Sequence, residues 1–168
     1  MEVISENQLT PRYAGFWLRF VAYIIDSFVI SIASFVMLIP MIIGIVFSAI
    51  SLEDVHNPQD FFQSGNWQSI GWIIGLALLA GIFSLIMQWL YYALMESSAT
   101  GGTLGKMALG IKVVDYEGNR ISFARASGRY FSKIITNMTL LIGYIIAGFT
   151  PKKQALHDII ASCIVIRK

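Results

Sequence analysis

Two long apolar stretches, residues 27–50 and residues 69–95, contain no charged residue. A helix of about 20 apolar residues crosses the hydrocarbon core of a bilayer, so each stretch is long enough to span a membrane. Hydrophobic residues make up 56% of the chain and charged residues only 13%, which lies outside the composition usual for soluble domains. These features predict an integral membrane protein and argue against a soluble enzyme.

The first predicted span covers residues 16–50, because only Arg19 and Asp26 interrupt its apolar character. The second covers residues 69–95 and has aromatic residues at both ends, as at the two surfaces of a membrane. The spans are separated by an acidic loop at residues 51–68 and preceded by a polar tail at residues 1–15. With 168 residues, the chain is expected to form a single membrane domain.

The basic residues predict the orientation. The acidic loop has no Lys or Arg, whereas residues 96–133 and the tail at residues 150–168 are basic. Basic residues favour the cytoplasmic side. The N-terminus, residues 96–133 and the tail are therefore expected inside, and the acidic loop outside, in a multi-pass protein of the cell membrane. The polar tail does not resemble a cleaved secretory signal.

The loop at residues 96–133 also contains a strand pattern. Residues 111–115 alternate as a strand does, Glu117, Gly118 and Asn119 form a turn signal, and residues 120–123 follow as a second short strand. Residues 161–167 are β-prone and are expected to add a third strand, since an isolated hairpin is only marginally stable. A small cytoplasmic β-hairpin or sheet is therefore predicted beside a mainly α-helical membrane protein.

A third apolar segment, residues 134–149, is short for a span, at roughly 24 Å as a helix. If it crossed the membrane once, the basic tail would lie outside, against the charge rule. Asn137, Thr139 and Gly143 offer a place for the helix to break. A re-entrant or interfacial helical hairpin is therefore favoured, with a third transmembrane helix as the alternative.

Asp26 is the candidate functional residue. Measured from Trp17, it lies roughly 13 Å deeper along the helix, near the middle of the bilayer, where a charge is costly and often functional. Buried carboxyl groups have raised pKa values, which predicts a cation or proton site at Asp26. Its supporting polar face is expected to comprise Ser27, Ser31, Ser34 and, on the second span, Gln88. The alternative is that Asp26 only fixes helix packing.

Three sequence blocks carry a resemblance to a known family: GFWLRFVAYIID at residues 15–26, TLGKMALGIKVVDYEGNRISFARASGRY at residues 103–130, and PKKQALHDIIASCIVI at residues 151–166. Together they resemble the RDD membrane proteins, named for one arginine and two aspartates. The resemblance implies that these residues are Arg19, Asp26 and Asp158, with Asp115 as the alternative for the last. It also implies a bacterial cytoplasmic membrane and a function that is largely unknown: cation/proton exchange has been proposed for some members, while others look like accessory proteins.

Two functions are therefore expected: cation/proton exchange through the Asp26 carboxylate or, alternatively, an accessory or scaffolding role in a larger membrane transporter. Two spans enclose little, so a homo-oligomer or a larger membrane partner is expected in addition to the lipid bilayer. The sequence contains no recognisable catalytic or metal motif, and its net charge of +2 does not indicate nucleic-acid binding. No enzymatic activity, metal, cofactor or nucleic-acid partner is predicted, and Asp158 is expected to pair with Arg19.

Overall fold

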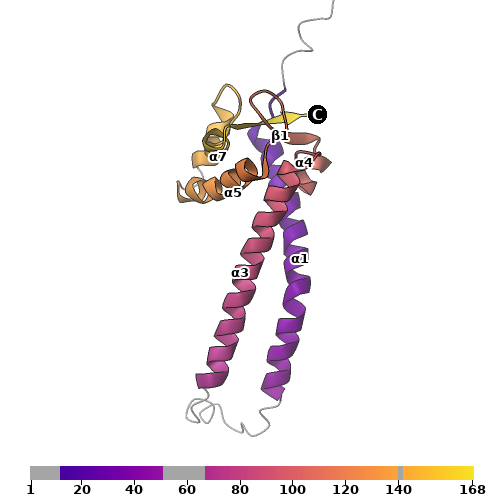
Figure 1. The fold of residues 1–168 in the computed structure, drawn as a ribbon, viewed down its shortest axis with the longest axis vertical. Helices are drawn as coiled ribbons and strands as arrows, with labels where there is room; N and C mark the ends of the chain where they lie inside the picture. Colours follow the sequence, from indigo (N-terminus) through magenta and orange to yellow (C-terminus); the bar gives the residue numbers. More distant parts are fainter. Residues whose placement is uncertain (1–11, 51–66, 140–141) are drawn as a thin grey trace, which may run out of the picture. The chain divides into compact units, whose positions relative to one another are not determined.

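The computed structural model describes residues 12–50, 67–139 and 142–168 (Figure 1). Most of the predicted N-terminal tail and acidic loop, residues 1–11 and 51–66, lies outside the described residues. The chain forms two compact units. Of the described residues, one unit contains 12–28 together with those from 89 onward, and the other contains 29–50 together with 67–88.

Both predicted spans are helices. Helix α1 covers Phe16–Ile50 and contains Pro40, and helix α3 covers Trp67–Ser97. The stretches Phe16–Gly44 and Ile74–Ser97 are long and apolar enough to cross a membrane. The unit of residues 29–88 contains the C-terminal part of α1 and the N-terminal part of α3. Large apolar side chains in it, such as Phe35, are exposed. Such exposure fits helices covered by lipid rather than water.

The other unit contains a small antiparallel sheet. Strand β1 (Ile111–Asp115) pairs with strand β2 (Cys163–Arg167), with Val113 opposite Val165. The chain just before α1 also bonds to β2, because the Ala14 amide donates to the Val165 carbonyl at 2.8 Å. The sheet therefore joins the segment just before α1 to the C-terminal strand β2. Its apolar core consists of Ala14, Ala22, Ala93, Ile111, Val113, Ile121, Ala126, Cys163 and Val165.

The predicted second strand of a local hairpin, residues 120–123, is not formed. The expected turn is present, since the Asp115 carboxylate accepts from the amides of Glu117 and Asn119 at 3.0 and 2.8 Å. Beyond the turn, however, Ile121 is buried and Ser122 caps the next helix, accepting from the Arg125 amide at 3.2 Å. A helix cap at this point ends any strand, so β1 pairs with the C-terminal strand instead.

Helix α5 begins at Phe123 and runs to Met138, so it starts well before the predicted segment at residues 134–149. The charged residues of α5, Arg125, Arg129 and Lys133, are spaced by four residues and therefore lie along one side of the helix. Helix α6 (Ile142–Ile145) and the 3-10 helix η2 (Ile146–Gly148) follow, and they are bent by 119° relative to α5. This bent pair occupies the place of the predicted re-entrant or third transmembrane segment. Two short helices, α4 (Leu104–Ala108) and α7 (Leu156–Ile160), complete the unit.

Candidate functional site: two buried polar clusters

The Asp26 carboxylate is buried, with 1% of the residue exposed, and it accepts three hydrogen bonds. The Tyr91 hydroxyl on α3 donates to Oδ1 at 2.8 Å, and the Gly105 amide donates to the same oxygen at 2.7 Å. The Thr103 hydroxyl donates to Oδ2 at 2.5 Å. Asp26 therefore connects α1 to α3 and to the glycine-rich segment that begins α4.

The lack of a side chain at Gly105 makes this arrangement possible. A Cβ atom placed there would lie 2.2 Å from the Ala22 carbonyl oxygen and 3.0 Å from the Asp26 carboxylate. Since backbone atoms cannot move aside as a flexible side chain does, only glycine lets the α4 backbone approach α1 closely enough to donate to Asp26. The glycine-rich sequence thus has a packing role at this position.

These three hydrogen-bond donors to the Asp26 carboxylate are not residues of the predicted polar face. The Ser27 hydroxyl donates to the Tyr23 carbonyl of its own helix at 2.8 Å. Ser31, Ser34 and Gln88 belong to the unit of residues 29–88, and their role beside Asp26 stays a prediction. The residues that donate hydrogen bonds to Asp26 are Tyr91, Thr103 and Gly105, which sequence reasoning did not select.

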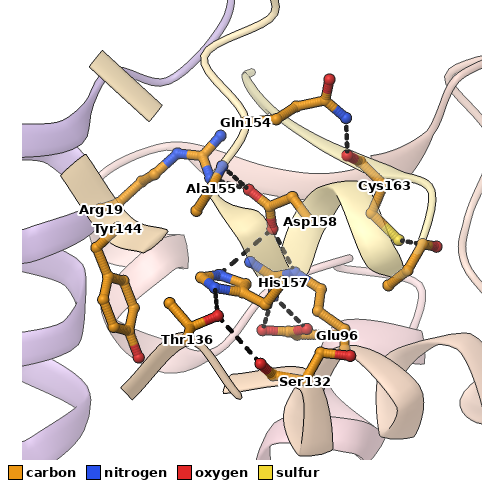
Figure 2. A network of polar contacts seen from close by, with 12 residues as sticks. Arg19, Glu96, Ser132, Thr136, Tyr144, Gln154, Ala155, His157, Asp158 and Cys163 are labelled. Atoms are coloured by element: carbon orange, nitrogen blue, oxygen red, sulfur yellow. Dashed lines mark hydrogen bonds and ion pairs between the residues drawn. The ribbon is translucent and has the colours of Figure 1, made fainter. Parts of the chain in front are cut away.

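A second buried cluster contains Arg19 and Asp158, in contact as expected (Figure 2). Arg129 on α5 extends the cluster: its Nε donates to Asp158 Oδ1 at 2.7 Å, and its Nη1 donates to both Glu96 oxygens at 2.6 Å. Lys106 on α4 also pairs with Glu96. We call these five residues the charge network. It connects α1, α3, α4, α5 and α7.

Sequence reasoning missed Glu96, Lys106 and Arg129 as network members. Their partners are distant in sequence, so Lys106 and Arg129 read as ordinary basic residues of a surface loop. One local signal was available for Arg129. In a helix that starts at residue 123, Ala126, Arg129, Ser132 and Thr136 fall on one face, and these are the buried residues of α5.

The charges of the network control its protonation. Burial alone would raise the pKa of Asp158, but the positive charges of Arg129 and Arg19 outweigh burial and hold this pKa below its usual range. Burial lowers the pKa of the Lys106 ammonium, and the charge of Arg129 lowers it further. The neighbouring His157 has its pKa lowered by burial to about 3 and is therefore neutral at physiological pH. Asp158 is an ionised carboxylate held by two guanidinium groups.

Neither cluster has the composition of a metal site. The Asp26 carboxylate is engaged by N–H and O–H donors, and the acids of the charge network are engaged by basic side chains. Within the part of the chain that the structure describes, no three His, Cys, Asp or Glu side chains gather as metal ligands. Chemically, both arrangements tie helices together through carboxylates.

Comparison with known proteins assigns the chain to a family. The family model described as "RDD family" matches residues 13–162, which include α1, both clusters and the bent helix pair. The chain belongs to the RDD family. This RDD protein is 33% identical to a protein of Bacillus subtilis (strain 168) named "Uncharacterized protein YxaI", over 92% of this chain and 97% of the relative. It is 31% identical to "Uncharacterized membrane protein YteJ" of the same organism, over 95% of this chain and 84% of the relative. No solved structure matches it.

In this RDD protein, the three residues that the family resemblance singles out divide between the two clusters. Arg19 and Asp158 meet in the charge network, and Asp26 anchors α4. Asp115, the alternative for the second aspartate, instead accepts backbone amides in the turn after β1, and its other oxygen lies 3.8 Å from Arg125. The contacts favour Asp158 as the position implied by the resemblance.

Proposed function

We propose that this RDD protein is an accessory or scaffolding subunit of a larger assembly in the cell membrane, without transport or enzymatic activity of its own. The observation that carries the proposal is that the buried Asp26 carboxylate accepts three hydrogen bonds from groups of the protein itself. A carboxyl group that exchanges a proton for a cation must release one set of partners and accept another, whereas Asp26 already accepts from Tyr91, Thr103 and Gly105. Such a carboxylate serves to fix helices.

The charge network supports the same proposal. Glu96 and Asp158 are each held by two basic side chains, and removing any member leaves at least one buried charge with one partner fewer. These contacts hold the ends of both spanning helices against the sheet-containing unit. In the proposed role, that unit is a rigid platform on the cytoplasmic side, with the N-terminus inside, and it binds a partner membrane protein.

Cation/proton exchange is the second candidate, and one observation favours it. Asp26 lies on a membrane-spanning helix, and two of its donors, Tyr91 and Thr103, are hydroxyl groups that can pass a proton. In this alternative the Asp26 carboxylate takes up a proton from one side of the membrane and releases it in exchange for a cation.

The deciding experiment reconstitutes the purified protein alone in liposomes and measures proton movement with a trapped pH-sensitive dye after a Na⁺ or K⁺ gradient is imposed. The parent is compared with Asp26→Asn and with the exposed control Glu117→Gln. The proposed role predicts no flux above protein-free vesicles in all three. Flux from the parent and from Glu117→Gln that disappears in a folded Asp26→Asn protein would instead establish exchange.

A positive test of the accessory role uses the native membrane. The protein is extracted in mild detergent and separated by native electrophoresis, and the polypeptides that comigrate with it are quantified. We expect one complex that contains a second membrane polypeptide in fixed ratio to this 18.7 kDa chain. Recovery of this chain alone, as a monomer or as copies of itself, would contradict a role as subunit of a larger transporter.

A further inference from the structure

Helix α5 has the reverse of the usual arrangement of a surface helix. Its buried face is polar and contains Arg129, Ser132 and Thr136. Its opposite face is apolar and exposed, with Phe131 at 49%, Ile134 at 56% and Met138 at 79%. A helix on a water-facing surface buries its apolar side and exposes its polar side. The outward face of α5 is therefore unsuited to water.

The elements that follow repeat this reversal. In α6, Gly143 is buried while Ile142 and Ile145 are exposed. In α7, His157 and Asp158 are buried, and the next two residues, Ile159 and Ile160, are 42% and 49% exposed. All three α-helices thus turn apolar side chains outward, and α5 and α7 turn polar side chains inward.

The sheet side of the same unit shows the ordinary arrangement. Val113 and Val165 are buried in an apolar core, whereas the turn beyond β1, which includes Glu117 and Asn119, is exposed and polar. One compact unit therefore has one side suited to water and another suited to an apolar medium. A protein that lies at a membrane surface requires this division.

The contacts of α5 with α3 show which part of α3 each face of α5 lies beside. The polar face reaches Glu96, the last residue but one of α3, through Arg129. The aromatic side chains Phe123 and Phe131 instead pack on Trp89, with ring centroids 5.9 and 5.7 Å away. Trp89 precedes Glu96 by two helical turns, which is roughly 10 Å along the axis of α3. This distance is about the diameter of a helix, so the two residues can contact opposite faces of α5. The apolar face of α5 therefore lies toward the aromatic residue Trp89 of α3, and the polar face toward the end of that helix.

The contacts along α5 place its length across α3 rather than parallel to it. Arg129, near the middle of α5, and Thr136, near its end, meet the neighbouring residues Asp158 and His157 of α7. Asp158 in turn pairs with Arg19 in the first turn of α1, at the end of that span. Both parts of α5 are thus held at the level where the spanning helices end.

We propose that α5, α6 and α7 lie in the plane of the membrane surface, and that their outward apolar face inserts into the acyl-chain and glycerol region of one phospholipid leaflet without crossing the bilayer. Amphipathic helices of this kind bury their apolar face about 5–10 Å into the boundary between headgroups and acyl chains. The inserted face comprises Phe131, Ile134, Met138, Ile142, Ile145 and Ile159. Lys133 is not part of this face, because its ammonium lies 3.9 Å from the centre of the buried Tyr92 ring.

The test measures the depth of nitroxide labels in phospholipid vesicles from their collision rates with oxygen and with a water-soluble nickel chelate. Single cysteines replace Ala124, Phe131 and Met138 in a Cys163→Ser background, one at a time. These positions are seven residues apart on the outward side of α5, and all three are exposed. Phe35, an exposed residue of α1, and Glu117 serve as membrane-interior and water controls. Each labelled variant is first checked for the elution volume and unfolding midpoint of the parent.

An in-plane helix predicts similar, shallow depths for the three α5 labels, between the depths at Phe35 and Glu117. A third span predicts a depth change of roughly 20 Å from Ala124 to Met138, at 1.5 Å per residue, and this result would overturn the proposal. Labels as accessible to nickel as the label at Glu117 would show a water-facing surface and would also overturn it. Spin–spin broadening together with loss of oxygen collisions would identify a second copy of the chain as the occupant instead of lipid.

Discussion

Arg129 is the side chain on which the charge network depends most. It is 3% exposed and bonds to both Glu96 and Asp158, which are 1% and 0% exposed. Moving such charges out of water costs several kcal/mol each, and the cost is offset only when geometry and hydrogen bonding are nearly complete. A planar guanidinium with five N–H donors meets two carboxylates in fixed directions, which a lysine ammonium does not.

The network makes Asp158 sensitive to the loss of its charge. The change Asp158→Asn leaves Arg19 and Arg129 close together without the carboxylate between them, and it is expected to lower the free energy of unfolding by about 3–5 kcal/mol. Glu117→Gln removes the same charge from an exposed turn and is expected to change stability by less than about 0.5 kcal/mol. Denaturant unfolding in detergent micelles measures both variants. Equal, small effects would show that the network does not stabilise the fold.

At the scale of elements, the docking of α4 on α1 depends on close backbone contact. Gly105→Ala places a methyl group against the Ala22 carbonyl oxygen. We expect a loss of about 1–3 kcal/mol in unfolding free energy, as for other overpacked positions. The displacement also weakens the hydrogen bond from the Gly105 amide to Asp26.

The matched control is Gly128→Ala in α5. A Cβ atom at this glycine meets no other atom within 4 Å, and alanine is a better helix former, so a gain of about 0.5–1 kcal/mol is expected. Unfolding of the two variants under the same conditions separates steric conflict from a general effect of replacing glycine. Destabilisation of both to the same extent would refute the close-contact explanation.

At the scale of the whole molecule, acidification is expected to reduce stability in two stages. Burial lowers the pKa of His157 from its ordinary value of 6.5 to about 3. The folded protein therefore holds His157 neutral at pH values where the unfolded chain binds a proton. Its contribution to stability is complete above about pH 6.5 and is lost as the pH falls, by about 2 kcal/mol between pH 6.5 and pH 5.

Asp158 adds the second stage. The pKa of Asp158 is held low in the folded protein, so further stability is lost once the pH falls below about 4, where the unfolded carboxyl takes up a proton. The measurement is the unfolding free energy of the parent and of His157→Gln from pH 7.5 to pH 3. The variant is expected to have a flatter profile over this range, and identical profiles would exclude His157 as the cause. The charged and polar groups that face His157 are Asp158, Arg129, Lys133, Arg19, Thr136 and Tyr144.

The sequence by itself determined the two spans, because an uncharged run of sufficient length has only one favourable environment and its ends are marked by polar residues. The predicted limits of residues 16–50 agree with those of α1, and the limits of α3 differ from the prediction by two residues at each end. The small sheet and the contact of Arg19 with Asp158 were also predictable, from β-prone runs and from the family resemblance.

Only the tertiary structure decided how the remaining polar residues are used. The pairing of β1 with β2, rather than with residues 120–123, depends on the cap at Ser122 and the burial of Ile121. The burial of Glu96 and Arg129 depends on bringing together helices that are distant along the chain. The hydrophobicity of a segment is a sum over residues that are neighbours in sequence, so it can be read from the sequence. A buried charge is tolerated only when an oppositely charged residue from another part of the chain neutralises it, and only the fold determines which residue that is.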